Sequence, residues 1–446
     1  MKKFVLLLLM GGIVFACTKD RLVDPLDIAL DKALKRIAPT GTRDYFELPE
    51  SEDLAAIPQD FVNNPLTPEK VALGKMLFFE TGLARDSKYD SGKGTYSCSS
   101  CHVPSAGFMP GRKQGIADGG TGFGENGEFR SQSSNYAEDE LDVQGARPLS
   151  MLNTAYVTNS TWSGKFGATH VNVGTEALWG TPEDELTEIN HLGYQGLESQ
   201  NIEGLSLHRM RIDEYVLDTL GYRPMFDEAF PDFPEEERYG VVTTSFALSA
   251  YIRNLLPTKA PFQQWVKGNY DAMTDIQKEG GLLFFGKAGC YRCHKGAALS
   301  SVEFHALGVG DLCDVDALNT GTTDIRNFGR GGFTGESEDL FKFKVPQLYN
   351  LKDSPFYFHG SSKNTLWGVV DYFNRAEPEN PRVPVSQISP FFHPLNMSIV
   401  EIQQLVAFLG DGLRDPDLQR FAPEAVLSGN CFPNNDPESQ QDLGCQ

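Results

Sequence analysis

The chain has little positive charge and, beyond a short stretch at its start, no long hydrophobic run. Its 446 residues contain 39 Lys and Arg against 60 Asp and Glu, which gives a formal net charge of −21. Nucleic-acid binding depends on clustered cations, so this balance argues against nucleic acid as a partner. The charge is compatible with electrostatic attraction of a basic redox partner.

Strand patterns and nucleotide-binding loops are also scarce. Few segments alternate polar and apolar residues with a period of two, the pattern of a half-buried strand. The Gly-rich stretches at 111–127 and 329–335 do not fit the spacing of a phosphate-binding loop. The length suits two or three domains, each able to bury a core. We therefore expect an all-α fold with long loops.

The hydrophobic stretch at the start has the form of an export signal. Two lysines precede an apolar run that starts at Phe4 and is too short to span a membrane. Ala16 directly before Cys17 resembles a bacterial lipobox. We expect a signal peptide at 1–16, a lipid anchor at Cys17 and a tether at 17–60. The alternative is an ordinary secretory signal with an incidental Cys. Either version predicts an exported protein, a periplasmic or cell-envelope lipoprotein in the first case.

Two copies of Cys-x-x-Cys-His, at residues 98–102 and 290–294, are the most informative motifs. Their thiols form thioether bonds to heme vinyl groups and the imidazole binds iron. Such attachment takes place outside the bacterial cytoplasm, in agreement with export. A zinc knuckle or a redox dithiol is the alternative, but zinc sites bring four ligands in close pairs. The expected heme-binding residues are Cys98, Cys101, His102, Cys290, Cys293 and His294.

Three cysteines remain after the heme motifs and the anchor. Cys431 and Cys445 enclose a short loop rich in Asn, Pro and Asp. In an oxidising compartment we expect them to form a disulfide that ties down the end of the chain. Cys313 is left over, either free or in competition for one of these partners.

Four features recur in the same order in both halves of the chain. Each half has a capped helix that ends in Leu-Phe-Phe, a heme motif, a Pro-containing segment that ends in Asn, and a Gly-containing segment. These are 67–79, 98–102, 148–153 and 162–164 in the first half, and 274–285, 290–294, 346–350 and 359–360 in the second. We therefore expect two cytochrome c-like domains, 61–256 and 257–415, related by internal duplication, with a tail at 416–446.

Capping signals and apolar spacing predict further helices. We expect a short helix over Asp24–Arg36 and an amphipathic helix over Glu236–Leu256. Ser398 and Glu401 form a capping box that opens a helix over Ile399–Leu409. The predicted core face of the second helix consists of Val241, Phe246, Leu248, Tyr251 and Leu255.

Longer segments around these motifs resemble the bacterial di-heme cytochrome c peroxidase and MauG superfamily. Leu-Gly-Lys-Met-Leu-Phe-Phe at 73–79 resembles the family's helix before the first heme. Phe-Lys-Phe-Lys-Val-Pro-Gln-Leu-Tyr-Asn at 341–350 resembles its second-domain signature, and 355–360 and 365–371 follow in the family's order. The resemblance covers roughly residues 68–415.

The resemblance implies two covalent c-type hemes with different tasks. The first heme, at Cys98, Cys101 and His102, would reduce hydrogen peroxide to water. The second, at residues 290–294, would pass on electrons from a small donor protein such as a cytochrome c or a cupredoxin. Two alternatives are a MauG-like enzyme that oxidises a partner protein and a non-catalytic di-heme electron carrier. Homodimer formation is left open.

One departure from the family concerns the residue above the first heme. The family has a Leu-x-x-Gln segment followed by a Glu-Met pair. In this chain the first segment is present and ends at Gln200. The later stretch reads Leu-His-Arg-Met, so Arg209 stands in place of the Glu. His208 is the best substitute, as a proton shuttle or as a sixth iron ligand, and Arg209 would stabilise negative charge. The alternative is that His208 and Arg209 are only a surface pair. Glu198 and Gln200 would then be the next candidates for the proton shuttle.

Other functional positions match the family less completely. Trp162 stands where the family has a Trp between the hemes, so it is an electron carrier or else a buried core aromatic. The family's sixth ligand to the second heme corresponds to Phe373, which cannot bind iron. The possible replacements are Tyr372, His393 and Met397. The family's inter-heme calcium site uses an Asn that Ala146 and Arg147 leave unmatched, so calcium is doubtful.

Overall fold

Helices and long loops make up the structure, a computed structural model that describes residues 24–58, 63–313 and 316–445. The helix-rich fold expected from the sequence is confirmed. The helices are α1 (Pro25–Ile37), α2 (Pro68–Phe79), α3 (Gly196–Leu207), α4 (Arg223–Ala229), α5 (Glu235–Arg238), α6 (Val241–Arg253), α7 (Pro261–Val266), α8 (Asp275–Phe284), α9 (Gly331–Thr334), α10 (Leu366–Arg375), α11 (Ile399–Ala407) and α12 (Pro437–Leu443).

Two short antiparallel strand pairs complete the regular structure. They are β1 (Gly120–Thr121) with β2 (Ser131–Gln132), and β3 (Phe304–His305) with β4 (Phe343–Lys344). In the part of the chain that the structure describes, no helix combines the length and the apolar character that a bilayer crossing requires. The predicted signal peptide at 1–16 and the anchor at Cys17 lie outside the described residues.

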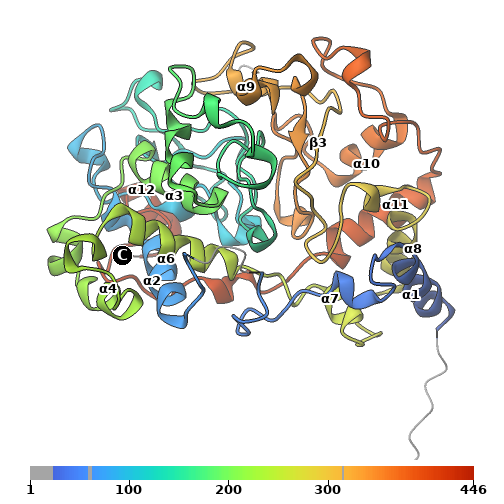
Figure 1. The fold of residues 1–446 in the computed structure, drawn as a ribbon, viewed down its shortest axis with the longest axis horizontal. Helices are drawn as coiled ribbons and strands as arrows, with labels where there is room; N and C mark the ends of the chain where they lie inside the picture. Colours follow the sequence, from blue (N-terminus) through green and yellow to red (C-terminus); the bar gives the residue numbers. More distant parts are fainter. Residues whose placement is uncertain (1–23, 59–62, 314–315, 446) are drawn as a thin grey trace, which may run out of the picture.

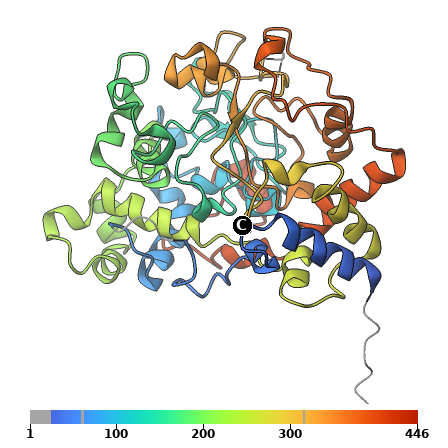
Figure 2. The same cartoon turned by 45° about the vertical axis from the view of Figure 1, so that its right-hand side comes forward.

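The helices gather at two ends of an elongated molecule. Helices α2, α3, α4 and α6 form one end, here called the first lobe, and α1, α7, α8, α10 and α11 form the other, the second lobe (Figure 1). Long loops fill the region between the two groups, as the turned view also shows (Figure 2).

One helix pair forms the centre of each lobe, and glycine permits its close approach. A Cβ atom added to Gly74 of α2 would lie 1.9 Å from the carbonyl oxygen of Ala247 on α6. A Cβ atom on Gly280 of α8 would lie 2.0 Å from the carbonyl oxygen of Gln404 on α11. Both distances are impossible for a side-chain carbon, so each helix pair requires glycine at its crossing.

The capping signals located most helix starts correctly. The side chain of Thr67 accepts a hydrogen bond from the backbone of Lys70 at the start of α2, and Ser398 caps α11 in a capping box. The helix predicted over 236–256 is shorter, because the chain breaks at Gly240 between α5 and α6. Val241 was predicted to face the core, but it is 44% exposed at the first turn of α6.

Helix α1 belongs to the second lobe. The sequence predicted a tether at 17–60, whereas Leu30 and Leu34 of α1 are completely buried. Lys278 of α8 forms ion pairs with Asp24 and Asp27, at 3.0 and 2.7 Å. From Pro25 onward this segment is therefore packed against the protein, because its apolar stripe finds a partner face on α8.

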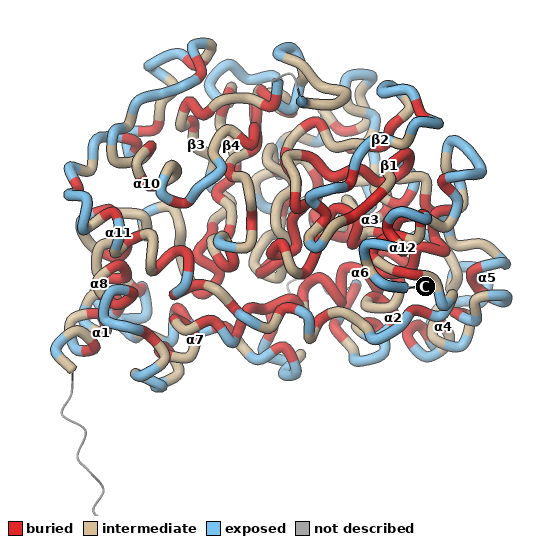
Figure 3. Tube along the Cα trace, turned by 180° about the vertical axis from the view of Figure 1, so that it is seen from behind, coloured by how far each residue is buried: buried red, intermediate tan, exposed pale blue. Residues whose placement is uncertain are grey.

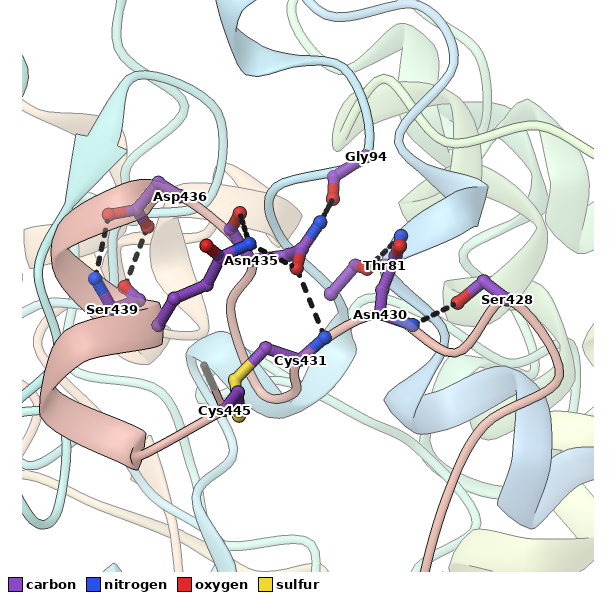
Figure 4. The surroundings of a disulfide bond; sticks show 10 residues. Thr81, Gly94, Ser428, Asn430, Cys431, Asn435, Asp436, Ser439 and Cys445 are labelled. Atoms are coloured by element: carbon purple, nitrogen blue, oxygen red, sulfur yellow. Dashed lines mark hydrogen bonds between the residues drawn. A yellow bond between two sulfur atoms is a disulfide. The ribbon is translucent and has the colours of Figure 1, made fainter.

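The end of the chain returns to the first lobe, where α12 contacts β1. The predicted disulfide between Cys431 and Cys445 is confirmed. Figure 4 shows how the segment is held: the Asn430 side chain donates to Thr81 Oγ1 at 3.0 Å, and that of Asn435 donates to the carbonyl of Gly94 at 3.2 Å. Residues 431–445, here called the C-terminal strap, therefore form part of the first lobe.

Candidate heme sites

The imidazole of the first motif is held in one tautomer. His102 Nδ1 lies 3.1 Å from the carbonyl oxygen of Phe108. Only an N–H can face a carbonyl oxygen, so Nδ1 carries the proton and Nε2 keeps its lone pair. Burial lowers the pKa of His102 to about 4, with a smaller contribution from the charge of His208. The ring is thus neutral and suited to bind iron through Nε2.

The second motif repeats this arrangement. His294 Nδ1 lies 3.0 Å from the carbonyl oxygen of Leu299 and 3.1 Å from that of Pro346. Burial lowers the pKa of His294 to about 4. Both motif histidines therefore present a neutral Nε2 that a metal can use.

The four motif thiols fit covalent attachment of heme. Cys98, Cys101, Cys290 and Cys293 are unpaired, although Cys431 and Cys445 are oxidised in the same structure. Each pair of thiols stands beside an imidazole with a free Nε2, which is the donor set of a c-type heme. A cavity of about 450 Å³ adjoins the second motif, lined by residues that include His305, Lys342 and Ser389. The residues present fit heme at both motifs.

His208 forms an ion pair close to the first motif. Its Nδ1 lies 2.8 Å from Asp142 Oδ2. Burial alone would lower the pKa of His208, but the attraction of the Asp142 carboxylate outweighs burial, and the pKa is raised. Because Nδ1 is engaged, Nε2 is the position available for chemistry. No sequence pattern indicated Asp142, since this contact joins two segments 66 residues apart.

Arg209 pairs with a different carboxylate. Its backbone lies in the left-handed region, at φ 55°, and its guanidinium forms an ion pair with the completely buried Asp118. Its Nη1 also donates to the carbonyl of Glu140 at 3.0 Å. The carboxylate of Asp118 therefore neutralises most of the charge of Arg209.

The two other candidates for the first site lie on α3. Glu198 is completely buried and forms an ion pair with Arg253, and it also accepts a hydrogen bond from the side chain of Asn64 at 3.0 Å. These contacts make Glu198 part of the helix packing between α3 and α6. Gln200 is half-buried on the same helix.

Trp162 joins the two halves of the chain. Its Nε1 donates to the carbonyl of Arg147 at 2.7 Å, and its own carbonyl accepts from the backbone of Lys344 at 2.8 Å. Its ring packs edge-on against Phe343 and His359, with centroids 6.3 Å away in each case. Phe343 and His359 themselves stack at 3.7 Å. Trp162 of the first half therefore packs against an aromatic pair of the second half.

The candidates for the sixth ligand of the second heme differ in burial. The hydroxyl of Tyr372 donates to the carbonyl of Leu307 at 2.7 Å, and Met397 is buried. His393 is exposed, and Phe373 packs against Tyr372. No sequence pattern indicated His305, whose Nε2 lies 3.6 Å from the thiol of Cys293. The charge of His305 contributes to the lowered pKa of His294.

For calcium, the described ranges contain no group of three or more His, Cys, Asp or Glu side chains arranged to hold a metal ion.

The two motifs differ in their exposure to solvent. In the first motif Ser99, Ser100 and Cys101 are buried and Cys98 is partly exposed. In the second motif Arg292 is exposed and Cys290 and Cys293 are partly exposed. Figure 3 shows the same contrast on a larger scale: buried backbone is concentrated around α3 and α12, whereas the turns near α10 and α11 are largely exposed or intermediate.

Two heme-attachment motifs in a helix-rich fold define a protein with two hemes. The family model for di-haem cytochrome c peroxidase matches residues 68–271, so the chain is similar to this family over that range. This similarity indicates two heme cofactors and an oxidoreductase that resembles cytochrome c peroxidases and MauG-like enzymes.

Curated relatives are similar over most of the chain. The methylamine utilization protein MauG of Methylorubrum extorquens is 29% identical over 383 residues, which cover 83% of this chain and 87% of the relative. The cytochrome c peroxidase Ccp of Escherichia coli is 25% identical over 348 residues, which cover 78% of this chain and 61% of the relative.

Solved structures share the fold. A MauG-like protein associated with microbial copper homeostasis has a TM-score of 0.58 at 22% identity and covers 88% of this chain and 99% of its own. A variant of the diheme peroxidase BthA from Burkholderia thailandensis has a TM-score of 0.53 at 18% identity and covers 85% of this chain and 91% of its own.

Proposed function

We propose that the protein reduces hydrogen peroxide to water at the first motif with electrons that enter at the second. The observation that carries this proposal is the contrast between the motifs. The first is more buried and has a polar ion pair, His208 with Asp142, beside its histidine. The second is partly exposed, so a protein donor can approach it. Each bound heme would supply an iron that changes oxidation state.

His208 is the group that handles protons in this proposal. Cleavage of the O–O bond requires a proton to move from the inner to the outer oxygen. His208 Nε2 would accept and return this proton, while Asp142 fixes the ring through Nδ1. The ion pair raises the pKa of His208, so the ring holds its proton to higher pH than a free histidine would. Arg209 takes a supporting role, because Asp118 already neutralises it.

Trp162 would connect the two hemes. Its hydrogen bonds reach the backbone of Arg147 in the first half and of Lys344 in the second. Its ring contacts the stacked pair Phe343 and His359. Asp311 lies 3.2 Å from His359 Nε2 and fixes that ring. A rigid aromatic cluster is a suitable medium for electron transfer because little reorganisation accompanies it.

A MauG-like oxidation of a partner protein is the second candidate, supported by the similarity to MauG over 83% of the chain. In that case the reducing equivalents would come from side chains of the partner. A covalent change in a co-purified partner, found by mass spectrometry, would distinguish this activity from peroxide reduction with a redox donor.

The proposal includes export, a lipid anchor at Cys17, and thioether attachment of both hemes. Four motif thiols that remain unpaired support the attachment. We also propose that the two halves arose by duplication, supported by equivalent asparagines. Asn153 and Asn350 both adopt a left-handed backbone, at φ 60° and 57°, and donate to the carbonyls of Leu255 and Leu413 at 3.0 and 3.1 Å.

The test removes the second heme and measures turnover. The variant Cys290→Ala with Cys293→Ala and His294→Ala should retain the first heme but lose peroxide reduction by a reduced cytochrome donor. As the control, Val385→Ala changes an exposed side chain of the same half and should keep wild-type turnover. Equal turnover in the variant and the wild type would refute this path of electrons. Electron paramagnetic resonance of the oxidised protein would identify the spin state of each heme.

A further inference from the structure

Two buried cations beside Trp162 have no partner of opposite charge. Arg147 is 2% exposed and Lys344 is 5% exposed. Among the residues that the structure describes, neither forms an ion pair with a carboxylate, and Lys344 Nζ makes no hydrogen bond. Burial lowers the pKa of Lys344 to about 8 and that of Arg147 to about 9. Both values express the cost of a buried charge without a counter-ion.

Three other buried cations of the chain each pair with a carboxylate. Lys278 pairs with Asp27 at 2.7 Å, Arg130 pairs with Asp436 at 3.2 Å, and Arg253 pairs with Glu198. Arg330 lacks a carboxylate, but four oxygens satisfy its guanidinium, those of Ser163, Gly164, Val171 and Asn172. Lys344 has none of these arrangements.

The guanidinium of Arg147 is partly satisfied. Its Nη2 donates to the carbonyl of Pro110 and to Ser354 Oγ, both at 2.9 Å, and its Nη1 donates to the carbonyl of Arg112. Its Nε is buried and has no hydrogen-bond partner. The charge thus remains uncompensated, and one donor remains available for an anion.

The two cations occupy equivalent positions. Arg147 stands six residues before Asn153, and Lys344 stands six residues before Asn350, the two left-handed asparagines. The backbone segment after each cation also contacts a histidine of a heme motif, either directly or through one shared carbonyl group. Pro346, two residues after Lys344, accepts from His294. The segment after Arg147 brings the backbone N–H of Met151 to the carbonyl of Phe108, which accepts from His102.

We propose that Lys344 binds a propionate of the second heme and Arg147 binds a propionate of the first. A heme carries two carboxylates, and these supply the negative charge that both buried cations lack. Trp162, hydrogen-bonded to the backbone of both residues, would then lie between two neutralised propionates. This inference requires two bound hemes and does not depend on reactivity toward peroxide.

The test uses Lys344→Gln and Arg147→Gln in the holoprotein, followed by redox titration of each heme. Loss of the cation leaves a bare propionate that stabilises oxidised iron, so the midpoint potential of the second heme should fall in Lys344→Gln, and that of the first heme in Arg147→Gln. The propionate's own pKa should rise, which makes the potential depend on pH. Lys344→Arg keeps the charge and should restore the wild-type potential.

Resonance Raman spectroscopy separates direct contact from a distant charge effect. The propionate bending band of the affected heme should move in each glutamine variant. Arg330→Gln removes a nearby buried cation whose donors are already satisfied, so it should leave this band unchanged. In the wild-type holoprotein the band should also shift in D₂O, a measurement that needs no variant. Unchanged bands in both glutamine variants, or no D₂O shift in the wild type, would overturn the proposal.

Discussion

Residues 98–102 and 290–294 fold into the same short turn and offer the same ligands, but the protein surrounds them differently. The first motif lies against the C-terminal strap and the loops that carry Asp142 and His208, and Cys101 is buried. The second lies at the surface beside a cavity, with Arg292 exposed. Identical ligand sets therefore do not imply identical chemistry, because solvent access and nearby charges determine what each iron can do.

Loss of the C-terminal disulfide tests whether the strap distinguishes the two motifs. Cys431→Ser with Cys445→Ser should lower the unfolding free energy of the strap by about 3 kcal/mol, the usual cost for a loop of this length. The heme spectrum of the first site should change, while that of the second site stays the same. Chemical denaturation followed in the absorbance of each heme would measure both effects. Equal changes at the two hemes would contradict a local role for the strap.

His208→Ala tests the proton shuttle. The peroxide step should slow by about 10²-fold or more, the usual range for loss of a general acid–base group. Rapid mixing with peroxide measures this rate, and donor oxidation at the second heme should not change. If His208 is instead a sixth ligand, the same variant should react faster without prior reduction. The control is His191→Ala, an exposed histidine of the first half, which should keep the wild-type rate.

Asp142→Asn should have a smaller and pH-dependent effect. The ion pair raises the pKa of His208, so without the carboxylate this pKa falls. His208 then loses its proton at lower pH, and the acidic limb of the pH–rate profile should move to lower pH. The maximal rate should drop by about tenfold because Nδ1 is no longer fixed by a charged partner. A profile that keeps its wild-type position would show that another group is titrating.

His305→Gln provides the matching test in the second half and should change peroxide reactivity least. His305 lies close to His294 of the second motif. In the same way, His208 lies close to His102 of the first motif. If the second heme only transfers electrons, the rate of the peroxide step should remain within about twofold of wild type, since no proton shuttle is lost there. The absorption spectrum of the second heme is the readout for a local effect. A large loss of peroxide reactivity would mean that the tasks of the two hemes are not divided in this way.

Sequence patterns indicated candidate heme ligands and several helix starts, but not the residues that surround those ligands. Thr67, Thr274 and Ser398 marked helix starts correctly because capping depends on residues three or four positions apart. Asp142, Lys344 and Arg147 were missed as a site because their significance arises from contacts between distant loops. The packing of α1 was not indicated by the sequence, since only the folded protein presents α8 as a partner for Leu30 and Leu34.

The position of the strap has a consequence for the order in which the protein matures. Ser97 and Ser100 of the first turn donate to the carbonyl of Pro433, a residue made long after both motifs have left the ribosome. Until it arrives, the turn that carries Cys98 and Cys101 lacks one wall. The surroundings of the first site are therefore complete only once the strap is in place.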